Sequence, residues 1–274
     1  MTSDQERLAR YVEIWKGAVD DVVALLRDLE HDDWARPTDL AGWDVRAVAA
    51  HLAHIESELS GVEQPKVTVP ELDHLTAPSA LYTEAGLIAR DSLTNSEIID
   101  ELVHAVDIRL EQLRSDPPTD ASADPPITPG GMPWDWETML RNRPLDVWMH
   151  EQDIRRAVAR PGGLNTDAAA HTSMVFTMSL PFSVGKKVSP PAGTTVVLDV
   201  SGVTPVHLAV EMNDSGRCVP MGSDPASPTV ALEMDLETFV ILGGGRRSAD
   251  DLSVEVTGDE VLGQRVLNAM AVTP

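Results

Sequence analysis

The stretch Arg143-Pro-Leu-Asp-Val-Trp-Met-His-Glu-Gln-Asp153 combines the spacing of an amphipathic helix with three side chains that can bind a metal ion. Asp146 and His150 are four residues apart, and His150 and Asp153 are three apart. Side chains at these spacings lie on one helical face, about 5–6 Å from each other. Apolar neighbours direct this face toward a helical core, where an unpaired carboxylate is costly. The stretch therefore predicts an inward-facing helix that carries polar chemistry.

Further helices are predicted on either side of this stretch. Each begins at a capping residue or after a Pro/Gly-rich segment and carries apolar residues every three or four positions. The long ones cover residues 4–29, 44–60, 94–115 and 136–158, with shorter helices at 80–91 and 165–180. The run 116–133 contains too much proline and glycine for a helix or a central strand. The first part of the chain is therefore expected to be a helical bundle.

The pattern changes after the linker-like segment 185–193. Residues 194–200 and 206–212 are rich in β-branched side chains and predict a hairpin, and further strands are expected at 230–233 and 252–256. Helical patterns at 236–242 and 260–270 complete this part. The expected organisation is a mostly helical domain over 1–185 and a small α+β domain over 190–274.

Composition excludes several functions. The 274 residues include 44 acidic and 21 basic side chains, a net charge of −23, so neither nucleic acid nor an anionic membrane is an expected partner. No apolar run approaches the ~20 residues that cross a bilayer, and the charged N-terminus does not resemble a signal peptide. The single cysteine, Cys218, is expected to be a small buried residue. The protein is expected to be cytoplasmic.

Two histidines on the second helix add to the metal hypothesis. His51 lies at the edge of the buried stripe, and His54 is expected to turn partly toward solvent. If His51 meets Asp146 and His150, the set of two imidazoles and one carboxylate suits zinc or another divalent metal and leaves a position open for water or substrate. Asp153 can then orient a histidine. The alternative is structural, with Asp146 paired to Arg143 or Arg155.

The stretches 41–52 and 143–155 resemble the actinobacterial mycothiol-dependent maleylpyruvate isomerase family. The C-terminal stretches 235–247 and 256–274 resemble its second domain. This resemblance implies a DinB-like four-helix bundle that binds metal, followed by a small α+β domain with a sterol-carrier-like fold.

The resemblance also implies a ligand set and a co-substrate. The family's zinc ligands fall on His51, Asp146 and His150, but the family usually has glutamate where this chain has Asp146. Because aspartate is one methylene shorter, the metal must lie nearer that backbone, bind weakly or be reached through water. The implied co-substrate is mycothiol, a low-molecular-weight thiol.

A metal-bound thiolate suggests two reactions on a small electrophile. In an isomerase, the thiolate adds to a cis-enoyl diacid, the new single bond rotates, and elimination gives the trans product. In an S-transferase only the addition occurs. The alternative is a non-catalytic small-ligand or metal-binding protein that keeps the fold without thiol chemistry. The sequence does not indicate the oligomeric state.

An acidic substrate would need local positive charge, which this chain offers at few positions. Arg246 and Arg247 are two of only four basic residues after position 190, and they are the candidate catalytic residues for binding a carboxylate. The alternative is that they pair with Asp250 or Asp251. The tryptophans on the predicted helices, Trp15, Trp43 and Trp148, are expected in the core.

Overall fold

The computed structural model describes residues 3–70 and 78–273. The chain divides into two compact units, Met1–Gly162 and Gly163–Pro274. This division precedes the expected boundary at 185–190, because helix α6 (Asp167–Phe182) packs on strands β2 and β3 and on helix α7 of the second unit. The fifth predicted helix therefore belongs with the sheet and not with the bundle.

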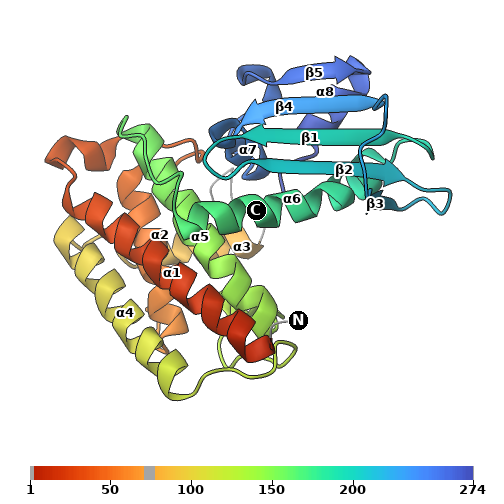
Figure 1. Ribbon diagram of the computed structural model, residues 1–274. Coiled ribbons are helices and arrows are strands. Elements are labelled where there is room, and N and C mark those ends of the chain that lie inside the picture. The colour runs from red at the N-terminus through yellow and green to blue at the C-terminus, as the bar shows by residue number, and fades with distance from the viewer. Residues whose placement is uncertain (1–2, 71–77, 274) are drawn as a thin grey trace. The chain divides into compact units, whose positions relative to one another are not determined.

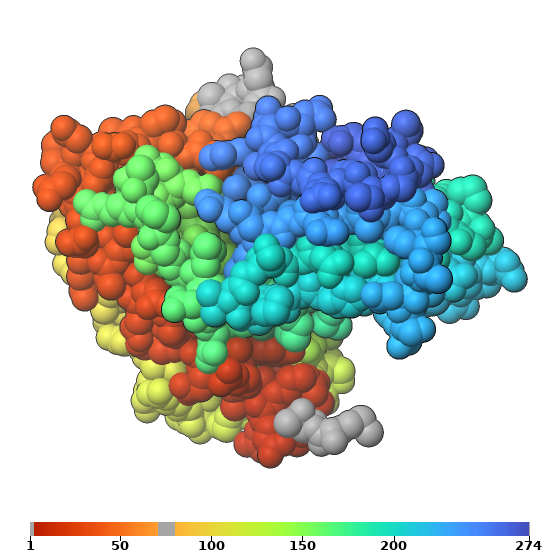
Figure 2. Space-filling view, turned by 45° about the horizontal axis from the view of Figure 1, so that its top comes forward, coloured from red at the N-terminus to blue at the C-terminus, as the bar shows by residue number. Residues whose placement is uncertain are grey.

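Four long helices form the bundle of the first unit, as the sequence predicts (Figure 1). They are α1 (Asp4–Arg27), α2 (Val45–Leu59), α4 (Asn95–Ser115) and α5 (Trp136–Ala157). Helix α3 (Pro78–Ile88) packs on α2, and short 3-10 turns cover His31–Ala35 and Pro129–Gly131. Helix α1 lies along α5, as the bordering red and green side chains in Figure 2 show, and α2 lies along α4.

Capping residues set the starts of these helices. Ser3 forms the predicted capping box with Glu6 at the start of α1, and the side chain of Asp44 accepts from the backbone N–H of Ala47 at the start of α2. Thr94 caps α4. Helix α5 begins at Trp136, so Pro144 lies inside it and not in its first turn.

Large apolar side chains fill the centre of the bundle. Trp15 is 1% exposed and Trp148 is fully buried, which confirms the prediction that both belong to the core. Around them lie the other large side chains that are almost completely buried: Leu8, Leu26, Leu52, Ile98, Leu102, Leu140, Met149 and Ile154. Helices α2 and α5, which carry the candidate metal ligands, are therefore held by packing along their inner faces.

A five-stranded mixed sheet forms the second unit, in the order β3-β2-β1-β4-β5. The strands are β1 (Thr195–Ser201), β2 (Val206–Met212), β3 (Cys218–Pro220), β4 (Val230–Asp235) and β5 (Glu255–Gly258). The predicted hairpin pairs β1 with β2, and β1 runs parallel to β4. Strand β5 begins three residues later than the strand expected at 252–256.

Helices pack on this sheet through an apolar strand pattern. Val196 and Leu198 of β1 pair with Val230 and Leu232 of β4, and all four are buried. Helices α6, α7 (Leu236–Gly243) and α8 (Glu260–Asn268) contact the strands, with a π-helical turn at Ser183–Val188 and a 3-10 turn at Ala249–Asp251. Within the described ranges, no helix has both the length and the apolar content that a membrane span requires.

Candidate metal site

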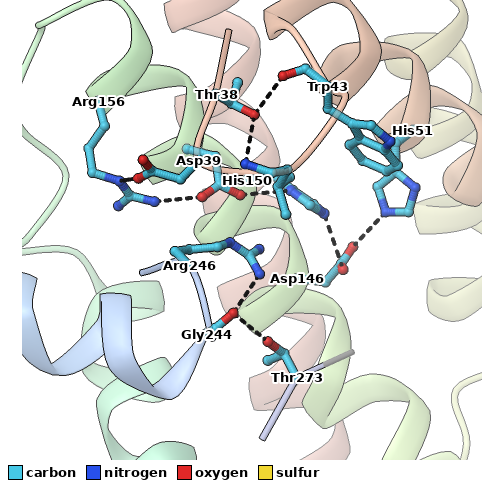
Figure 3. A network of polar contacts seen from close by, with 12 residues as sticks. Thr38, Asp39, Trp43, His51, Asp146, His150, Arg156, Gly244, Arg246 and Thr273 are labelled. Carbon is cyan, nitrogen blue, oxygen red and sulfur yellow. Dashed lines mark hydrogen bonds and ion pairs between the residues drawn. The ribbon is translucent and has the colours of Figure 1, made fainter. Parts of the chain in front are cut away.

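Helices α2 and α5 bring three metal-binding side chains together inside the first unit. His51 of α2 meets Asp146 and His150 of α5, and each offers one ligand atom within 4.8 Å of the others. Nε2 of His51 lies 4.0 Å from Oδ2 of Asp146, and Nε2 of His150 lies 3.6 Å from Oδ1 of Asp146. Both imidazoles point toward the carboxylate in Figure 3. The fold thus brings His51 to the pair Asp146 and His150 that helical spacing predicts.

Burial and neighbouring charges give these side chains the protonation states that bind a cation. Burial lowers the pKa of His51, which keeps its imidazole neutral and able to donate a lone pair. Burial alone would raise the pKa of Asp146, but the nearby Arg143 and the two histidines outweigh it and lower the pKa. The cluster therefore combines a neutral imidazole with a carboxylate that stays ionised.

The hydrogen bonding of His51 is incomplete. Its Nδ1 is buried without a hydrogen-bond partner among the described residues, and the 4.0 Å from its Nε2 to Asp146 is too long for a hydrogen bond. A metal bound by Nε2, the nitrogen that faces Asp146, would leave Nδ1 without a partner. Donor atoms around a tetrahedral zinc ion are about 3.3 Å apart, given bonds of about 2.0 Å. The spacing and the donor types fit a divalent metal.

A second layer of polar side chains supports His150. Its Nδ1 lies 3.1 Å from Oδ2 of Asp153, which is fully buried. Arg156 donates to Oδ1 of Asp153 at 2.5 Å and to Oδ2 of Asp39 at 2.7 Å. The predicted orienting contact between Asp153 and a histidine is therefore present. Sequence spacing gave no signal for Asp39, which comes from the loop between α1 and α2.

Trp43 was wrongly placed in a helical stripe. It precedes the N-cap of α2 and is partly exposed. Its ring centroid lies 5.1 Å from that of His51 and 6.2 Å from that of His150, so one indole contacts both imidazoles (Figure 3). Its position directly before the cap of the His51 helix is the sequence signal that could have identified it.

Of the two arginines that could pair with Asp146, Arg143 is the one that does. Its Nη1 donates to Oδ2 of Asp146 at 2.8 Å, whereas Arg155 pairs with Glu151. The carboxylate at the centre of the cluster thus has an arginine partner as well as two histidine neighbours. A metal ion bound at this carboxylate would compete with Arg143 for Oδ2.

His54 differs from expectation, because it is only 4% exposed. Its Nδ1 lies 3.1 Å from Oε1 of Gln64, and its ring packs on that of Tyr82 at 4.8 Å. A Cβ atom at Gly86 would lie 2.2 Å from the ring, so α3 presses directly on the imidazole. His54 is a packed core residue and does not belong to the cluster.

The remaining candidates lie in the second unit. Arg246 and Arg247 follow α7, Arg246 donates to the carbonyl oxygen of Gly244, and Arg247 is exposed. Cys218 is half-buried and not buried as expected, and this partial burial raises its pKa to about 11, which is unfavourable for a nucleophile. A role of the two arginines in substrate binding stays a prediction.

Sequence profiles of known families match both units. The profile of the mycothiol maleylpyruvate isomerase N-terminal domain matches residues 15–155, just over half of the chain, and that of the MDMPI C-terminal domain matches residues 174–265. The chain belongs to the mycothiol maleylpyruvate isomerase family. The candidate ligands all lie in the part that matches the family's N-terminal domain.

Solved structures of this family share the fold. The crystal structure of the mycothiol-dependent maleylpyruvate isomerase matches with a TM-score of 0.54 at 17% identity, covering 94% of this chain and 96% of that chain. A mutant of that enzyme, with a histidine replaced by alanine, matches with a TM-score of 0.52 at 16% identity, with the same coverage. No curated protein matches the sequence. The fold prediction, a helical bundle followed by a small α+β domain, is therefore confirmed.

Proposed function

We propose that this protein is a zinc-dependent or other divalent-metal-dependent enzyme that uses mycothiol as co-substrate in an isomerase or S-transferase reaction on a small electrophile. One observation carries the proposal: the buried His51 and His150 and the partly exposed Asp146 form a three-donor cluster in a chain of the mycothiol maleylpyruvate isomerase family. When bound there, the metal would lower the pKa of the thiol and so supply a thiolate nucleophile.

The chain's own residues would hold and shield this centre. Asp153 accepts a hydrogen bond from Nδ1 of His150 and leaves its Nε2 lone pair directed at the cluster. Three protein donors leave at least one coordination position for a thiol. The indole of Trp43 lies against both imidazoles and limits the access of water from its side.

Metal analysis and a thiol-dependence assay test the proposal. The purified protein is expected to retain about one divalent ion per chain, while His51→Ala and His150→Ala lose it. With mycothiol and a cis-enoyl diacid, an isomerase gives the trans product without consuming thiol, whereas an S-transferase consumes one thiol per product. A wild-type protein with no more metal than the two variants, or a reaction independent of thiol, would overturn the proposal.

Arg246 and Arg247 are proposed to bind the carboxylate of an acidic substrate. Adjacent guanidinium groups bind carboxylates well, and basic residues are scarce in the second unit. Replacing either arginine by glutamine is expected to raise KM for a diacid more than for a neutral electrophile. Equal effects on both substrates would exclude this role.

The ion pair between Arg143 and Asp146 supports a second candidate function. It satisfies one carboxylate oxygen without any metal, as in a non-catalytic protein that binds a small ligand. Such a protein, whether it binds a small ligand or a metal, is not stabilised by mycothiol. A thermal-shift measurement with zinc, mycothiol and lipids separates the two candidates, because only a species that binds the folded chain raises Tm.

A further inference from the structure

All four long helices of the bundle converge on the carboxylate of Glu56. This side chain of α2 is completely buried. Trp15 of α1 donates to its Oε1 at 2.9 Å, and Arg109 of α4 donates to its Oε2 at 2.7 Å. Arg143 of α5 donates to Oε1 from Nε at 3.1 Å and from Nη2 at 2.7 Å. Contacts from three other helices therefore fix this carboxylate.

Arg143 connects Glu56 to the candidate metal site. Its third nitrogen, Nη1, donates to Oδ2 of Asp146 at 2.8 Å. The guanidinium of Arg143 thus binds two carboxylates. Two of its nitrogens donate to Glu56, and the third donates to Asp146. Together with Arg109, the group contains two positive and two negative charges, so its formal charge is zero.

The Asp146 oxygen that accepts a hydrogen bond from Arg143 also faces the candidate metal cluster. Oδ2 of Asp146 is the atom 4.0 Å from His51, while Oδ1 faces His150. A guanidinium without a competing partner binds a carboxylate through two parallel hydrogen bonds. Because Glu56 occupies two of its nitrogens, Arg143 makes only a single contact with Asp146. The strength of the interaction between Arg143 and Asp146 therefore depends on Glu56.

We propose that Glu56 is a positioning residue of the metal site, which restrains Arg143 and so keeps Asp146 available to the metal. The inference rests on the metal-binding part of the proposed function. Without the charge of Glu56, Arg143 is free to pair fully with Asp146, and the surroundings of the site gain a positive charge. Both effects oppose binding of a divalent cation.

The test measures metal affinity without thiol or substrate. Cobalt(II) is titrated into the metal-free protein and followed by visible absorption, and zinc affinity is obtained by competition. Glu56→Gln keeps the shape of the side chain and removes its charge. It is expected to weaken metal binding about tenfold or more, the usual range for changes behind a metal ligand.

A second variant separates a loss of metal affinity from a folding defect. Glu56→Gln leaves Arg109 and Arg143 buried with only the charge of Asp146, which destabilises the bundle. Combining it with Arg109→Gln restores a formal charge of zero and leaves Arg143 facing Asp146. The double variant is expected to fold and still to bind metal more weakly than wild type, because Arg143 can pair fully with Asp146. Its loss is expected to be smaller than that of Glu56→Gln, because the added positive charge is absent.

Arg109→Gln alone is the matched control. It disturbs the same buried carboxylate but leaves the contacts among Glu56, Arg143 and Asp146, so its metal affinity is expected to be no weaker than that of wild type. Equal affinities of wild type and the double variant would overturn the inference, as would an equal loss in the control. A wild type that binds no metal overturns the proposed metal dependence and this inference together. A wild type that binds metal but shows no thiol chemistry overturns only the reaction.

Discussion

His150 donates a hydrogen bond from Nδ1 to Oδ2 of Asp153, because an ionised carboxylate can only accept. The contact fixes the tautomer in which Nε2 keeps its lone pair, and Nε2 is the atom 3.6 Å from Asp146. Asp153 itself is held by Arg156, which also pairs with Asp39. The orientation of a candidate ligand thus depends on a buried residue three positions along the same helix.

Asp153→Asn is expected to weaken metal binding about tenfold, because an amide orients the imidazole less firmly and is a poorer acceptor than a carboxylate. Cobalt titration of the metal-free protein measures the effect. Asp39→Asn is the control, since it removes the other carboxylate on Arg156 without touching His150. Similar losses in the two variants would mean that Asp153 acts through Arg156 and not through the histidine.

Two glycines in helices give opposite predictions for stability. Gly17 lies in α1, and no described atom beyond its own stretch of helix comes within 4 Å of the position that a Cβ atom would take there. Gly17→Ala is therefore expected to raise the free energy of unfolding by about 0.5–1 kcal/mol. A Cβ atom at Gly243 of α7 would lie 2.5 Å from Cδ2 of Phe176 in α6. Gly243→Ala is expected to lower that free energy by about 1–3 kcal/mol.

Chemical denaturation of both variants provides the measurement. The comparison also tests the assignment of α6 to the second unit, because the strain arises only if α6 packs on α7. A neutral or stabilising Gly243→Ala would show that this packing is loose.

Periodicity and capping residues were sufficient to predict the bundle, because the caps at Ser3, Asp44 and Thr94 are local signals. The candidate ligands on α5 followed from helical spacing for the same reason. The position of α6 could not be predicted this way, since a helix with an apolar face can pack on a bundle or on a sheet.

The polar residues that support the cluster come together only in the tertiary structure, so the sequence alone does not predict their contacts. Glu56 and Arg143 are 87 residues apart, and no local pattern marks a charged residue as buried. His54 was expected to turn partly toward solvent, but α3 covers it. The burial of His54 therefore depends on its packing against α3, which the pattern of its own helix does not show.

Cys218 is expected to react slowly with thiol reagents. Burial raises its pKa from 9.0 to about 11, which lowers the thiolate fraction near pH 8 on the order of 100-fold. Iodoacetamide labelling followed by mass spectrometry checks this, with glutathione as the reference thiol and urea-unfolded protein as the control. Labelling of the folded chain at the rate of glutathione would contradict the burial of this thiol.

His207 is expected to titrate above its ordinary value. Its Nδ1 lies 2.6 Å from Asp199 and its Nε2 lies 2.7 Å from Asp224, and both nitrogens can donate only in the protonated ring. These two hydrogen bonds raise the pKa of His207 above 6.5. A raised pKa in the folded state stabilises the fold fully below about pH 6.5, and this contribution is lost as the pH rises through the folded pKa. NMR titration of the ring protons measures the pKa, which Asp199→Asn should lower while Asp214→Asn, in the turn after β2, leaves it unchanged. A pKa at or below 6.5 in the wild-type protein would show that neither carboxylate holds the ring.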